Sequence, residues 1–90
     1  MKFHLGDRVY IEGHWNFPKG CKGTISAPPE FALRSVSDPA PWDGIRRTVR
    51  GRKGPIEFYW IQFDEPQIDG DGDGPSPEGE VESAYLHLLD

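Results

Sequence analysis

The sequence has few thiols and no long apolar run. Its single cysteine, Cys21, excludes a disulfide within the chain, so a reducing cytoplasm is the expected location. The first 13 residues lack the apolar stretch of a signal peptide. No segment approaches the roughly 18 consecutive apolar residues that a membrane span needs. We therefore expect a soluble cytoplasmic protein.

Cations are missing from the end of the chain, where acidic residues accumulate. From Glu57 to Asp90 there are ten acidic residues and no Lys or Arg. The net charge is −5, yet five cations fall within eight residues of the middle segment: Arg46, Arg47, Arg50, Arg52 and Lys53. The simplest interpretation is that the two segments pair across strands of one domain. A net acidic chain is a poor general nucleic-acid binder.

The pattern of turns and apolar residues predicts an all-β protein. Glycine and proline together supply 20 of the 90 residues, which is typical of short strands joined by turns. Alternation predicts a half-buried strand at 8–12, and the apolar faces of 56–63 predict a central strand covered on both sides. Further short strands are expected at 23–26, 45–50 and 80–82. Long loops should span 30–44 and 64–79, and Ser83 should cap a short helical turn near the end of the chain.

These elements describe one domain, residues 1–90, with a small core. The residues that should lie in or near it are Val9, Ile11, Ile25, Val49, Ile61, Phe63 and Leu86. Five short strands with almost no helix indicate a small closed barrel.

Two segments of the sequence resemble SH3-like barrels of the KOW and Tudor type. The opening "LGDRVYIEG" with "PKGCKGTI" is similar to the first two strands of such barrels, and "YWIQFDEP" with "EVESAYLHLL" is similar to their last strands and closing turn. The residues "VRGRKG", "FDEP" and "ESAYL" also resemble the barrel of nitrile hydratase β subunits. The resemblance implies a five-stranded SH3-like barrel, and because its motifs are mostly glycines and core residues it specifies the fold better than the function. The metal-binding cysteine cluster of nitrile hydratase belongs to its other subunit, so that activity is not implied.

An aspartate–glycine repeat supplies a candidate metal site. Asp69, Asp71 and Asp73, followed by Glu80, match the spacing of a calcium loop. Their carboxylates, with the Pro75 carbonyl, could supply the oxygens that calcium prefers. Pro77 and the strand-like flanks depart from the helix–loop–helix pattern, and the alternative is a flexible acidic hairpin loop. No other cofactor is indicated.

Aromatic residues near loops supply a candidate surface for a protein partner. The predicted partner-binding residues are Trp15, Phe17, Trp42, Tyr59 and Trp60. The rings could instead cover the open ends of the barrel. The basic segment 46–53 beside these rings could bind RNA, because arginine and aromatic groups contact phosphates and bases.

No catalytic arrangement stands out, because the three histidines are scattered and a Cys21–His14 pair would lack two of the four usual zinc ligands. We therefore predict a non-catalytic protein-interaction module or accessory subunit, with RNA binding as the alternative.

Overall fold

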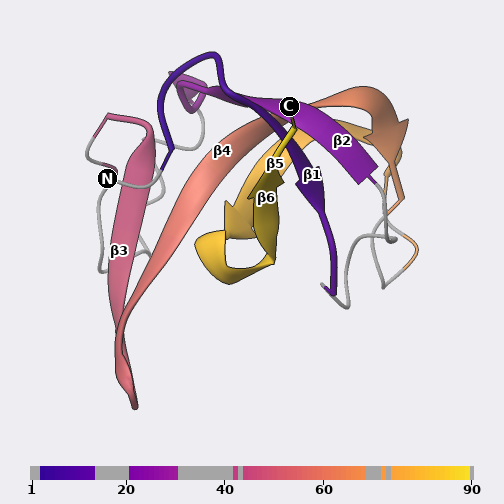
Figure 1. Cartoon of the computed structure of the whole chain (residues 1–90). Helices are drawn as coiled ribbons and strands as arrows, with labels where there is room; N and C mark the ends of the chain where they lie inside the picture. The colour runs from indigo at the N-terminus through magenta and orange to yellow at the C-terminus, as the bar shows by residue number, and fades with distance from the viewer. Residues whose placement is uncertain are drawn as a thin grey trace.

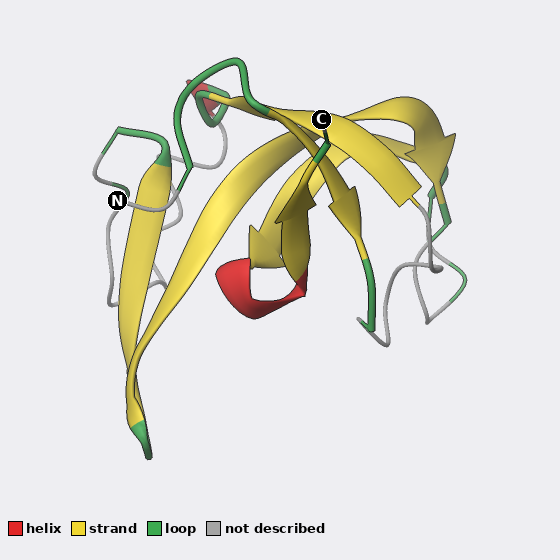
Figure 2. Cartoon of the chain, viewed as in Figure 1, coloured by secondary structure: helices red, strands yellow, loops and turns green. Residues whose placement is uncertain are grey.

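The structure is a computed structural model that describes residues 3–13, 21–30, 42, 44–68, 72 and 74–89. These residues form six antiparallel strands and one short 3-10 helix (Figures 1 and 2). The strands are β1 (Arg8–Ile11), β2 (Cys21–Ser26), β3 (Arg46–Gly51), β4 (Gly54–Gln67), β5 (Ser76–Glu82) and β6 (Leu86–Leu88), and the 3-10 helix η1 is Ser83–Tyr85. The all-β prediction is confirmed, whereas the expected number of five strands is wrong.

Strand β4 is the central strand of the sheet, because three other strands pair with it. Its first half pairs with β3, and its second half pairs with β2 on the same edge and with β5 on the opposite edge. The sheet order is β3-β4-β2-β1-β6, with β5 attached to β4. Among the described strands the hydrogen-bonded order therefore has free ends, and this sheet is open rather than the closed barrel that the sequence predicted.

The extra strand arises at the end of the chain, where a helical turn was expected. Only Ser83–Tyr85 is helical, and the chain is extended again from Leu86 to Leu88. Strand β6 pairs with β1 and places Leu86 opposite Ile11. Backbone pairing with β1 and burial of Leu86 favour a strand there over continuation of the helix. Ser83 begins η1, but no side chain caps it.

The core lies on the inner face of the bent sheet. In β1 the alternation places Val9 and Ile11 inside, and both are fully buried. Six of the seven predicted core residues are buried, and Val49 is the exception because β3 extends past the core. Burial also includes residues that the sequence did not single out as core: Phe3, Cys21, Tyr59 and Val81. The rings of Phe3 and Tyr59 pack edge to face with centroids 5.1 Å apart.

The first half of β4 and all of β3 form a hairpin that extends away from the rest of the sheet (Figure 1). Its turn is Arg52-Lys53, between the paired residues Gly51 and Gly54. Gly54 has a φ of 127°, a conformation that side chains with a Cβ rarely adopt. A Cβ on Gly51 would lie 2.6 Å from Ile56 Cδ1. The glycines on both sides of the turn thus allow a tight, narrow tip.

Within the part of the chain that the structure describes, no helix is long and apolar enough to cross a membrane.

Candidate functional site

The part of the predicted aromatic surface that the structure describes is largely buried. Tyr59 is 0% exposed and belongs to the core, so it does not form part of a partner-binding surface. Trp60 is 6% exposed on the opposite face of β4, and the half-buried Trp42 packs edge-on against it at 5.9 Å. Trp15 and Phe17 lie outside the described residues. The sequence could not distinguish a covered ring from a presented one, because both faces of β4 are apolar.

Polar contacts on the outer face of β4 involve two glutamates of β5. The Trp60 indole Nε1 donates a hydrogen bond to Glu78 Oε1 at 2.6 Å. Arg47 donates from Nε and Nη2 to the two carboxylate oxygens of Glu80, each at 3.1 Å, and its guanidinium lies 5.0 Å from the centre of the Phe58 ring. Arg47 is nearly buried, so its charge is used inside the domain.

The basic segment is therefore divided into an internal part and a free part. Arg46 pairs with Glu57 at 2.9 Å and Arg47 with Glu80, as expected from cross-strand pairing. The remaining three cations, Arg50, Arg52 and Lys53, are exposed at the hairpin tip. None of them forms an ion pair with another residue that the structure describes. Of the five predicted nucleic-acid contacts, three remain available to a ligand.

The calcium loop can be followed only in part. Asp69, Asp71 and Asp73 lie outside the described residues, and Pro75 is exposed at the start of the return toward β5. Glu80 lies well inside β5, about 13 Å along the strand from Ser76 at 3.3 Å per residue. Its carboxylate is bound by Arg47. Glu80 is thus held by Arg47 within β5, and the calcium site itself stays a prediction. In the described ranges, no three His, Cys, Asp or Glu side chains gather in a way that could hold a metal ion.

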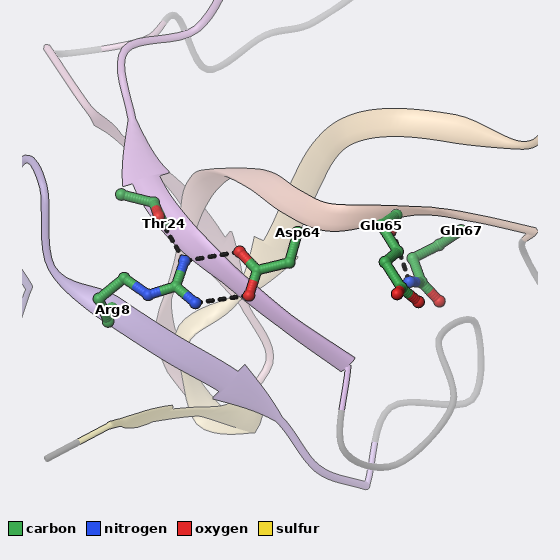
Figure 3. Close-up of polar contacts among 5 residues, drawn as sticks. All are labelled: Arg8, Thr24, Asp64, Glu65 and Gln67. Atoms are coloured by element: carbon green, nitrogen blue, oxygen red, sulfur yellow. Dashed lines mark hydrogen bonds and ion pairs between the residues drawn. The ribbon is translucent and has the colours of Figure 1, made fainter.

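A polar cluster that the sequence did not reveal joins three strands (Figure 3). Arg8 on β1 donates two hydrogen bonds to the carboxylate of Asp64 on β4, at 2.6 and 2.5 Å, and a third to Thr24 on β2 at 2.8 Å. Arg8 lowers the pKa of the Asp64 carboxyl, chiefly through these hydrogen bonds. The two residues are 56 positions apart, so no local pattern could have predicted the pair.

Beside this cluster lies a pocket of about 300 Å³ lined by Cys21, Lys22, Asp64, Glu65 and Gln67. Gln67 reaches back along its own strand, and its Nε2 donates to the Glu65 carbonyl at 2.7 Å. Burial, with a smaller contribution from the Asp64 charge, raises the pKa of the Cys21 thiol to about 11. The thiol is therefore protonated near neutral pH and is a poor nucleophile.

A larger groove of about 670 Å³ separates the hairpin from η1. One side is formed by the start of β4, and the other by the end of β5 and η1. The lining residues are Lys53, Pro55, Ile56, Glu57, Glu82, Ser83 and Ala84. The groove and the free cations thus share one arm of the molecule, since Lys53 belongs to both.

Comparison with known proteins gives no relative for this chain: no family description matches it, and no curated protein or solved structure is significantly similar.

Proposed function

We propose that this chain is a non-catalytic protein-interaction module that binds an acidic partner protein through the tip of the β3–β4 hairpin. The observation that carries the proposal is the group of three exposed cations on the projecting hairpin: Arg50, Arg52 and Lys53. Arginine and lysine recognise carboxylates, and cations on a projecting arm steer an acidic surface toward it. The acidic residues of the remaining chain would repel the same partner from the body of the domain.

The finer fold that we propose is a partly open barrel of the SH3-like kind. Its five strands would be β1, β2, β4, β5 and β6, with η1 before the last strand. In support, the chain returns from η1 to pair β6 with β1. The hairpin would then be an addition to the barrel, formed by β3 and an extended β4. Such an addition would supply a binding arm without disturbing the core.

Site-specific photocrosslinking tests the proposed function. A photoreactive amino acid replaces Arg52 at the tip or, as a control, Leu5, which is 66% exposed on the N-terminal turn. After irradiation in a cell extract, we expect a protease-sensitive adduct from position 52 and none from position 5. The adduct from position 52 should be competed by added unmodified protein. A Lys53→Glu competitor should be much weaker than a Lys22→Glu competitor, which has the same charge change on β2. Equal competition by the two would contradict binding at the tip.

Nucleic acid is the second candidate, because a two-stranded β ribbon can enter the major groove of a duplex. The available cations set a limit on this interaction. A plot of the logarithm of the binding constant against the logarithm of the salt concentration should have a slope of about −2.7 for three phosphate contacts. Five contacts would give a slope of about −4.5. A duplex titration at several salt concentrations measures this slope, and nuclease treatment of the adduct from position 52 distinguishes the two partners.

A further inference from the structure

We infer that the partner is held as an added β strand along an open edge of β4, between Gly54 and Glu57, with its acidic residue toward the hairpin tip. The inference rests on the proposed function, since both place the partner on the hairpin. It adds the mode of binding and the chemical class of the bound segment: an extended peptide in which an aliphatic residue lies next to an acidic one.

Within the described residues, this edge is open because β5 ends before the hairpin does. Phe58 and Tyr59 pair with both β3 and β5, so these two strands lie on opposite edges of β4. Strand β5 ends at Glu82, opposite Phe58, and the chain then turns into η1. Toward the tip, β3 still covers one edge of β4, whereas no described strand covers the other. Residues 54–57 therefore have one edge that is unpaired within the described part of the fold.

The direction of the backbone groups follows from the glycine contacts. A Cβ added to Gly51 on β3 would lie 2.9 Å from the carbonyl oxygen of Gly54. A Cβ added to Gly23 on β2 would lie 2.5 Å from the carbonyl oxygen of Gln62. Both carbonyls belong to even-numbered residues of β4 and face the edge shared by β3 and β2. Because backbone groups alternate between the edges, Pro55 and Glu57 face the open edge. The open edge thus offers the Glu57 N–H and the carbonyls of Glu57 and Pro55. Proline at an open edge costs no ladder hydrogen bond.

The groove beside this edge favours one kind of occupant. Its walls combine aliphatic atoms of Pro55, Ile56 and Ala84 with one free cation, Lys53, at the tip end. Glu57 contributes little free negative charge because Arg46 binds it at 2.9 Å. Glu82 lies at the other end of the groove. An added strand would therefore place an acidic side chain near Lys53, an aliphatic side chain over Ile56, and an uncharged or basic residue near Glu82. Strand addition provides affinity through the backbone and selectivity through alternate side chains.

Peptide selection followed by amide NMR tests the inference. A display library of short random peptides is selected against the immobilised full chain, and an enriched peptide is titrated into labelled protein. We expect enriched sequences that combine Asp or Glu with Val, Ile or Leu, and the largest shifts at Ile56, Glu57 and Ala84. Recovery of no such sequence, or shifts confined to other strands, would overturn the inference.

Variants of the edge residue separate strand addition from charge attraction. Glu57→Pro removes the N–H at the open edge, and Glu57→Gln is the matched control that keeps the N–H and loses the carboxylate. We expect Glu57→Pro to weaken peptide binding about five- to tenfold, as for one lost hydrogen bond, and Glu57→Gln to change it little. Ala84→Trp, which fills the groove from the other side, should also block binding and covers the case in which Glu57→Pro fails to fold.

The same variants distinguish failure of this inference from failure of the proposed function. If the adduct from position 52 forms normally with both Glu57→Pro and Ala84→Trp, the tip binds a partner but the open edge does not. If no adduct forms with the parent protein, the proposed function itself fails.

Discussion

The Arg47–Glu80 pair should make a measurable contribution to stability, and Glu80→Gln is the change that tests it. The side chains of Arg47 and Glu80 are 10% and 39% exposed, so the pair is intermediate between a surface and a buried ion pair. Exposed pairs contribute about 0.2–1 kcal/mol, whereas removing one partner of a fully buried pair costs about 3–5 kcal/mol. Because the Arg47 charge stays nearly buried when Glu80 is neutralised, we expect a loss of about 1–2 kcal/mol in the free energy of unfolding.

The stability lost in Glu80→Gln should depend on the positive charge that remains on Arg47, and a double-mutant cycle isolates that dependence. Arg47→Met keeps much of the aliphatic volume over Phe58 while it removes the cation, and the Glu80 carboxylate left behind is accessible to water. Glu80→Gln should therefore cost much less in the Arg47→Met background, with a coupling energy near 1 kcal/mol.

Urea unfolding followed by tryptophan fluorescence measures all four proteins, since Trp60 packs on the same face of β4. The slope of the free energy against urea should stay constant across the cycle if the transitions are two-state. A coupling energy below about 0.3 kcal/mol, within the error of additivity, would refute the argument that Glu80 compensates a buried charge.

Three other predictions concern the fold. Gly23→Ala should lower the free energy of unfolding by about 1–3 kcal/mol in the same urea assay, because the added Cβ would lie 2.5 Å from the Gln62 carbonyl oxygen. An unchanged urea midpoint would show that β2 and β4 move apart there at little cost. Arg8 lowers the folded-state pKa of Asp64, so the stability from this pair is present above about pH 4 and is lost as the pH falls through the folded-state pKa. The free energy of unfolding should therefore fall less steeply with acid in Asp64→Asn than in the parent protein. The pKa of Cys21 near 11 predicts that iodoacetamide alkylation of the folded protein keeps accelerating up to about pH 11, whereas a plateau near pH 9 would contradict burial of the thiol.

The sequence predicted the elements whose signals are local. Alternation identified β1, the two apolar faces of 56–63 identified the middle of β4, and the glycine turn identified the tip of the hairpin. The expected loop 64–79 is wrong at both ends, because β4 continues to Gln67 and β5 begins at Ser76. Six of seven core residues followed from the same patterns. The end of the chain was predicted less well: leucines at 86 and 88 fit a helical turn as well as a short strand, and only the pairing with β1 selects the strand.

The candidate site depended more heavily on tertiary structure. The sequence identified a basic cluster, but the free and the internal cations look alike in it. Arg47 is internal because the register of β4 with β3 and β5 brings Glu80, 33 positions away, to its side. The same register places Tyr59 inside the core and Trp60 outside it, beneath Trp42.

By itself, the sequence determined an all-β chain with a basic middle segment and an acidic end, because composition, alternation and turn residues act within a few positions of each other. The tertiary structure decided which charges are neutralised, which rings are covered and where one edge of β4 has no partner among the described strands. Those properties depend on how far each strand runs along its neighbour. Strand β5 ends opposite Phe58, and β4 continues for four more residues toward the tip, to Gly54. That difference in strand length, which no single segment encodes, creates the open edge.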